Sequence, residues 1–78
     1  MPVLAFVLVD VTGDHTKSAY KTITRMTGVK SVYAVTGAHD IIILAEADSI
    51  ETLGDLILSK IRSIDGVTKT MTSIVLNI

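Results

Sequence analysis

The stretch VTGAHD (residues 35–40) lies between two apolar runs, Val29–Val35 and Ile41–Ala47, and it decides the fold of this chain. A short segment with Gly and Asp between runs rich in Val and Ile is typical of a turn that joins antiparallel strands. Gly37 adopts a positive φ without steric cost, and Asp40 can accept hydrogen bonds from backbone N–H groups. We name residues 35–40 the corner, and we expect it at the sheet edge with N–H groups and a carboxylate exposed.

The strands predicted around the corner have two kinds of hydrophobic pattern. Val29–Val35 alternates between its two faces, which predicts a half-exposed strand. Ile41–Ala47 and Pro2–Asp10 are apolar on both faces, which predicts strands that are buried on both sides. Val67–Ile78 is predicted to be the last strand.

A first amphipathic helix is predicted over His15–Met26. Its N-cap is expected to be Asp14 or Thr16, because carboxylates and hydroxyls accept from the free N–H groups of the first turn. Gly28 fits the left-handed position that follows many helices. The apolar positions share helical spacing: Ala19, Ile23 and Met26.

A second helix is predicted to begin after Asp48 and to end at Asp65-Gly66. Asp48 and Glu51 have the spacing of a capping box. Its apolar residues form one stripe, which we expect to be buried: Ile50, Leu53, Ile57, Ile61 and Ile64, widened by Leu56. Gly54 costs a helix up to ~1 kcal/mol relative to Ala, so close packing is expected there.

The predicted order is strand, helix, strand, strand, helix, strand. The two halves echo each other, since TGVK (27–30) after the first helix matches DGVT (65–68) after the second. This order predicts an α+β, ferredoxin-like βαββαβ fold, a four-stranded antiparallel sheet with both helices on one face. The first and third strands are central in that plan. The other sheet face would be exposed in a monomer, so we predict a homodimer through the sheet that buries about 600–800 Å² per subunit.

Composition limits the class of protein. The chain has 78 residues, 49% of them hydrophobic, and no cysteine, so we expect one domain over residues 1–78 without disulfides. Its mean hydropathy of +0.57 exceeds what a small monomer can hide, which favours burial against other copies. The net charge is −1 with scattered Lys and Arg, so no nucleic-acid surface is expected. No apolar run is long enough to span a bilayer, and we expect a cytoplasmic protein.

Metal binding and catalysis have little support in the residues. The two histidines, His15 and His39, lie in different turns without ligand spacing, so we expect neither a metal nor a cofactor. His39 and Asp40 are adjacent, but neighbours in a turn usually point apart, and the other carboxylates are scattered at element ends. An enzyme of the dimeric α+β barrel type uses the same βαββαβ unit and stays an alternative, although it needs converging polar groups inside.

Two features admit both a structural and a ligand-binding interpretation. The threonines on one face of the last strand, Thr68, Thr70 and Thr72, fit simple β-propensity but also offer hydroxyls to a polar ligand. The corner is either a structural turn or a binding site for an amino acid. In the second case, N–H groups near Gly37 would bind the carboxylate and Asp40 would accept from the ammonium group.

Three segments together resemble the effector-binding domain of the Lrp/AsnC feast/famine regulators, also called the RAM (regulation of amino acid metabolism) domain. They are YAVTGAHDI (33–41), the helix over 49–64 ending in IDGV (64–67), and TMTSIVL (70–76). The resemblance covers essentially the whole chain. Full-length regulators add an N-terminal helix-turn-helix domain, whereas this sequence begins in its first strand, so we expect a stand-alone domain that does not bind DNA itself.

The resemblance implies a ferredoxin-like domain that dimerises through its sheets and assembles into rings, often octamers. Amino-acid effectors would bind between dimers near the corner. By position, the effector-binding residues would be Gly37, Ala38, His39, Asp40, Thr70 and Thr72. Val35 stands where some members have a polar or aromatic residue. The domain would regulate transcription through full-length Lrp/AsnC regulators, or it would be a ligand-free assembly partner of them.

Overall fold

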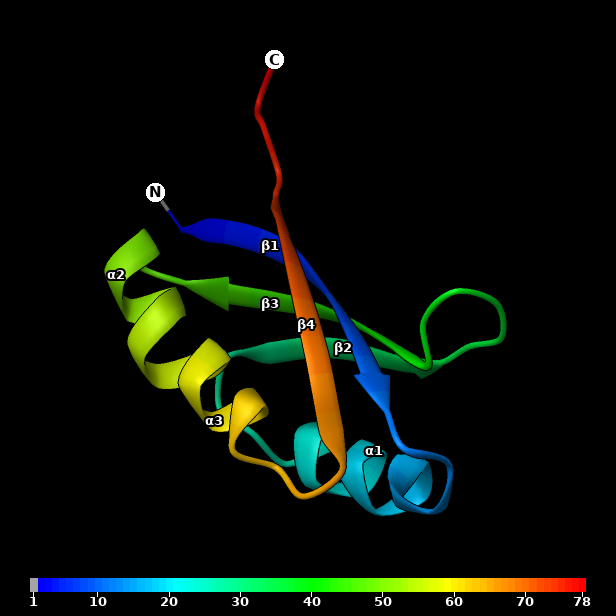
Figure 1. Cartoon of the computed structure of the whole chain (residues 1–78). Helices are drawn as coiled ribbons and strands as arrows, with labels where there is room; N and C mark the ends of the chain where they lie inside the picture. The colour runs from blue at the N-terminus through cyan, green and yellow to red at the C-terminus, as the bar shows by residue number, and fades with distance from the viewer. Residues whose placement is uncertain (1) are drawn as a thin grey trace.

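The computed structural model describes residues 2–78, apart from the side chain of Leu56. Four strands are present: β1 (Val3–Val11), β2 (Val29–Ala34), β3 (Ile41–Ala47) and β4 (Val67–Ile74). The first helical segment comprises a 3₁₀ turn, η1 (Gly13–His15), and α1 (Thr16–Thr24). The second runs from α2 (Ile50–Thr52) through the π-helical η2 (Leu53–Leu58) to α3 (Ser59–Arg62). The predicted order of elements is confirmed (Figure 1).

The four strands form one antiparallel sheet in the order β2-β3-β1-β4. Val7 of β1 lies between Ile43 of β3 and Thr72 of β4 in the register of the sheet. The first and third strands are therefore central, as their hydrophobic patterns predict. The ferredoxin-like α+β fold is confirmed.

One face of the sheet packs against the helices and forms the core. On the central strands the core positions alternate: Ala5, Val7, Val9 and Val11 on β1, and Ile41, Ile43, Ala45 and Ala47 on β3. Five helical side chains cover them: Ala19, Ile23, Leu53, Ile57 and Ile61. Every core residue in the described part of the chain is apolar. The helix layer thus removes one face of the sheet from water.

The opposite face carries the intervening residues and has no helix over it. We name this the open face. Its apolar residues are Leu4, Phe6, Leu8, Tyr33, Ile42, Leu44 and Met71, and the register places Asp10, Ser31, Glu46, Lys69 and Ser73 on the same side. Phe6 remains 43% exposed and Met71 46% exposed. A continuous apolar patch over both central strands is more than a small monomer usually presents to solvent.

The N-termini of both helical segments differ from prediction. Ser49, not Asp48, caps the second segment, because its side chain accepts from the Thr52 N–H at 3.1 Å. The capping box is therefore wrong by one residue. Neither Asp14 nor Thr16 caps the first segment, since the 3₁₀ turn begins earlier and His15 N–H donates to the Thr12 carbonyl at 2.9 Å. A backbone carbonyl thus replaces the expected side-chain cap there.

The second helical segment differs from prediction at Gly54 and Ile50. A Cβ on Gly54 would meet nothing within 4 Å, so close packing there was a wrong expectation. Instead the Gly54 carbonyl accepts from both the backbone N–H and the Oγ of Ser59, five residues on, which is the π-helical pattern. Ile50 is 65% exposed because the first turn lies beyond the covered sheet, beside an apolar hollow that it shares with Leu4 and Leu76.

The last strand ends at Ile74, four residues earlier than predicted. Beyond it, Val75 N–H still donates to the Leu4 carbonyl at 2.8 Å, and the final residues run out in an extended conformation (Figure 1). The left-handed conformation predicted for Gly28 is confirmed by its φ of 94°.

Candidate functional site

The corner joins β2 to β3. Within residues 2–78, its backbone N–H groups form hydrogen bonds at the two ends of the loop. Val35 N–H donates to the Asp40 carbonyl at 2.9 Å, and Asp40 N–H donates to the Val9 carbonyl at 3.0 Å. Between these anchors the loop projects beyond the strands (Figure 1), and Gly37 has a φ of 103°. Such a backbone conformation suits glycine and strains other residues.

The tip of the corner offers unpaired backbone donors. Gly37 and Ala38 are exposed, and a Cβ on Gly37 would meet nothing within 4 Å. Within residues 2–78, the N–H groups of 36–39 have no hydrogen-bond partner in the protein. Backbone N–H groups without a partner in the protein are available to an anion such as a carboxylate.

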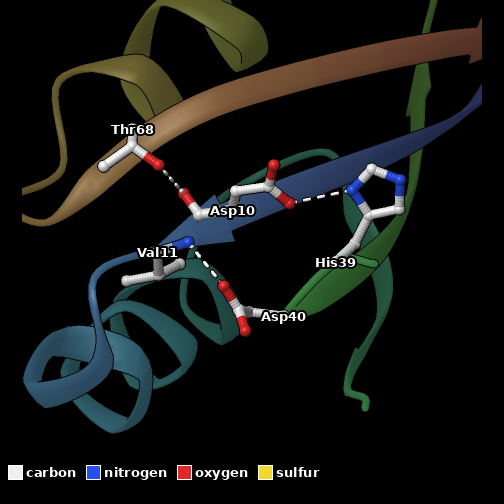
Figure 2. Close-up of polar contacts among 5 residues, drawn as sticks. All are labelled: Asp10, Val11, His39, Asp40 and Thr68. Carbon is white, nitrogen blue, oxygen red and sulfur yellow. Dashed lines mark hydrogen bonds and ion pairs between the residues drawn. The ribbon is translucent and has the colours of Figure 1, made fainter. Parts of the chain in front are cut away.

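Asp40 holds the corner against the first strand. Its Oδ2 accepts from the Val11 N–H at 2.8 Å, in a half-buried position (Figure 2). This bond joins residues far apart in sequence, whereas the sequence indicated only a local turn bond. No hydrogen bond to the other carboxylate oxygen occurs within the described residues. Asp40 therefore combines a structural role with one oxygen that is still available.

His39 does not pair with its neighbour Asp40, as expected for adjacent turn residues. Its Nδ1 instead lies 2.8 Å from Oδ1 of Asp10, near the end of β1 (Figure 2). The two side chains are 25% and 27% exposed. Sequence reasoning missed Asp10 as part of this site. The available signal was an acidic residue closing an otherwise apolar strand, but nothing in the sequence indicated its partner.

The threonines of β4 lie on the other side of β1 from the corner. Thr70 and Thr72 pair with Val9 and Val7, and Oγ1 of Thr70 accepts from Nε of Arg62 at 3.3 Å. A shallow cleft of about 210 Å³ contains Thr70, Arg62, Thr68 and Lys69, but no corner residue. Within one chain, the predicted site residues therefore form two groups separated by a strand.

The end of β1 connects the two groups. Thr68 Oγ1 donates to the Asp10 carbonyl at 3.2 Å, while the Asp10 carboxylate faces His39 (Figure 2). Asp10 thus contacts the corner with its side chain and the last strand with its backbone.

Among residues 2–78, no three His, Asp or Glu side chains are close enough together to hold a metal ion. In the same described part of the chain, no helix is long and apolar enough to cross a membrane.

A small α+β domain with an apolar core, an uncovered apolar sheet face and an exposed loop of free N–H groups belongs to the class of ligand-binding and interaction domains. The family model of the Lrp/AsnC ligand binding domain matches residues 4–78. The chain is therefore a member of this family, and the resemblance noted in its motifs is confirmed.

Individual relatives agree with this assignment. The chain is 32% identical over 76 residues to the uncharacterized HTH-type transcriptional regulator PH0140 of Pyrococcus horikoshii, covering 97% of this chain and 48% of the relative. It thus spans about half the length of the curated relatives it matches.

Solved structures show the same fold at nearly full coverage. The protein TTHA0845 from Thermus thermophilus superposes with a TM-score of 0.90 and 30% identity, over 97% of this chain and 95% of that one. The feast or famine regulatory protein Rv3291c from M. tuberculosis, complexed with L-methionine, gives a TM-score of 0.74 and 29% identity, over 97% of this chain and 51% of that one.

Proposed function

We propose that this chain binds an amino-acid effector at the corner and passes the signal to transcription by assembling with itself and with full-length Lrp/AsnC regulators. The observation that carries the proposal is the row of unpaired N–H groups at 36–39 beside a carboxylate with one free oxygen. Membership in a family of ligand-binding domains, and the complex of one relative with L-methionine, support the same ligand class.

The chemistry of the corner matches both charges of an amino acid. The effector carboxylate accepts from N–H groups around Gly37 and Ala38, where no side chain blocks the approach. The effector ammonium donates to the oxygen of Asp40 that Val11 leaves free. The effector carboxylate therefore meets hydrogen-bond donors, and its ammonium group meets a carboxylate.

A second chain completes the site in this proposal. Thr70 and Thr72 are separated from the corner of their own chain by β1, so they serve the corner of a neighbouring copy. Binding then depends on assembly, and a monomer binds weakly. This dependence gives the effector a means of shifting the oligomeric state, since a ligand stabilises the state that it binds best.

The open face supplies the first assembly step. Pairing two open faces, centred on Phe6 and Leu8, buries about 600–800 Å² per subunit, which is typical of a specific protein interface. Dimers then associate into rings, such as octamers, through contacts that bring corners and threonines together. Light scattering that gives a monomer mass for the wild-type protein would contradict this part of the proposal.

In this role the chain neither catalyses a reaction nor binds DNA itself, and it acts in the cytoplasm with the regulators it would join. Described core residues are all apolar, so the converging polar groups that the enzyme alternative needs have no support there. The similarity to HTH-type transcriptional regulators favours a regulatory role instead.

Thermal-shift measurements against the twenty amino acids test the sensing function. A ligand at 100 times its Kd adds about 2.7 kcal/mol of stability, which raises Tm by roughly 10–20 °C in a domain of this size. Asp40→Asn keeps an oxygen for the Val11 N–H but removes the charge, so it should abolish most of the shift. Asp55→Asn, an exposed carboxylate on the helical side, is the matched control.

Two experimental results would contradict the sensing function, and the second would replace it with a structural role. If no amino acid shifts the melting of the wild-type protein, the sensing role is wrong. If the protein then co-purifies with a full-length Lrp/AsnC regulator and amino acids leave that complex unchanged, it is a structural assembly partner.

A further inference from the structure

The pair formed by His39 and Asp10 is as short as the bond from Val11 N–H to Asp40, yet turn formation does not require it. Its atoms lie 2.8 Å apart and both side chains are about three-quarters covered. The backbone of the corner is already anchored through Val35, Asp40 and Val9. A charge-assisted hydrogen bond at such a site orients a side chain rather than folding the loop.

We propose that Asp10 is a positioning residue that fixes the His39 ring, so that Nε2 of His39 accepts a hydrogen bond from the ammonium group of the effector. The inference rests on the amino-acid-binding function proposed above and deepens it by assigning one ligand group to one protein atom. Asp10 itself does not touch the ligand.

The chemistry of the pair determines which ring nitrogen carries the proton. An ionised carboxylate only accepts, so the nitrogen facing Asp10 must be Nδ1–H. In a neutral imidazole the other nitrogen, Nε2, is then an acceptor. Figure 2 shows that Nε2 lies on the side of the ring away from Asp10. The pair thus presents the Nε2 lone pair on the side of the ring that faces away from Asp10.

The carboxylate of Asp10 is itself held in place. Its backbone carbonyl accepts from Thr68 Oγ1 at 3.2 Å, and its residue pairs with Lys69 across the sheet. The ring position is therefore set by two strands, β1 and β4, and not by the exposed tip of the loop. Groups held by rigid strands give better defined ligand geometry than groups held by a loop alone.

This arrangement selects for a free amino group. His39 Nε2 is an acceptor without a hydrogen-bond partner in residues 2–78, and it matches an ammonium group. The unpaired N–H groups of the tip match the carboxylate. L-Methionine should therefore bind more tightly than N-acetyl-L-methionine by more than tenfold, because acetylation removes the positive charge and leaves only one N–H donor.

The first experiment needs no ligand. Long-range proton–nitrogen NMR of the wild-type protein at mildly alkaline pH should show His39 as the Nδ1–H tautomer, and Asp10→Asn should shift it toward the Nε2–H form that free imidazole prefers. A wild-type spectrum with the proton on Nε2 would overturn the inference, whatever the protein binds. His15 provides an internal reference, because no side-chain contact to its ring nitrogens occurs within residues 2–78.

The second experiment separates ligand contact from loop structure. The amide nitrogen of Asn and the Nδ1 of His are both three bonds from Cα. His39→Asn therefore keeps a donor for Asp10 but removes Nε2. Calorimetry with L-methionine as the probe should show about tenfold weaker binding for His39→Asn and for Asp10→Asn, with unchanged melting of the free proteins. Equal affinity in His39→Asn and wild type would limit His39 to a structural role and refute the inference.

The outcomes distinguish this inference from the proposed function. If L-methionine or another amino acid binds the wild-type protein and both variants equally, the sensing function stands and the role of Asp10 is wrong. If none of the twenty amino acids binds, the proposed function is wrong and the assignment of Nε2 to a ligand falls with it.

Discussion

The two faces of the sheet are built from neighbouring residues of the same strands, but they meet different surroundings. Ile43 is fully buried beneath the helices, whereas Ile42, the next residue along β3, lies on the open face and is half-buried. The side chains are identical, so only their position in the pleat separates them. Within residues 2–78, the helices cover one face of the sheet and no helix covers the open face.

The largest expected effect lies on the helix face. Ile43→Ala should lower the free energy of unfolding by about 2–5 kcal/mol, because it removes buried methylene groups and leaves a cavity. Ile42→Ala is the matched control and should cost clearly less when measured on the monomer. Urea denaturation of both variants provides the comparison. Equal losses would mean that the two faces are equally packed in a single chain.

A charge on the open face should separate assembly from folding. Phe6→Lys places an ammonium group at the centre of the predicted interface, and we expect dimer affinity to fall by about 2–4 kcal/mol, roughly 30- to 1,000-fold. The monomer should keep its circular dichroism spectrum. Thr22→Lys, on an exposed position of α1, is the control. Sedimentation velocity decides the outcome, and an unchanged mass for Phe6→Lys would place the interface elsewhere.

The smallest effect concerns two glycines beside the helix layer. Gly54→Ala should stabilise the protein by about 0.5–1 kcal/mol, because a Cβ there meets nothing and Ala favours helix. Gly28→Ala should destabilise it, since its φ is 94° and a Cβ would lie 2.7 Å from Cδ1 of Ile57. Thermal melts of both variants test these predictions: the Tm of Gly54→Ala should rise, and the Tm of Gly28→Ala should fall.

The sequence was informative wherever one physical rule acted alone. Runs apolar on both faces predicted that β1 and β3 are central, and the alternation of Val29–Val35 predicted a half-exposed strand, which is the edge strand β2. Gly28 was predicted to be left-handed because few other residues tolerate that backbone. These rules use only neighbours in sequence, and they were sufficient for the whole order of elements.

Prediction failed where several candidates competed or where partners were distant. Asp48 and Ser49 are both good caps, and only the backbone path decides that Ser49 reaches the Thr52 N–H. The pairing of His39 with Asp10 requires the register of β1 against β3, which the sequence does not state. The predicted effector residues remain a prediction for the same reason, because a site shared between chains depends on contacts outside one chain.

The hydrogen bond from Val11 N–H to Asp40 has a consequence for measurement. This amide lies at the end of a central strand, yet its acceptor belongs to the corner rather than to the β-ladder. Its hydrogen-exchange rate therefore follows local opening of the corner, while the amides of Val7 and Val9 follow opening of the sheet. The exchange rate of this single amide proton thus reports how often the loop detaches from the strand.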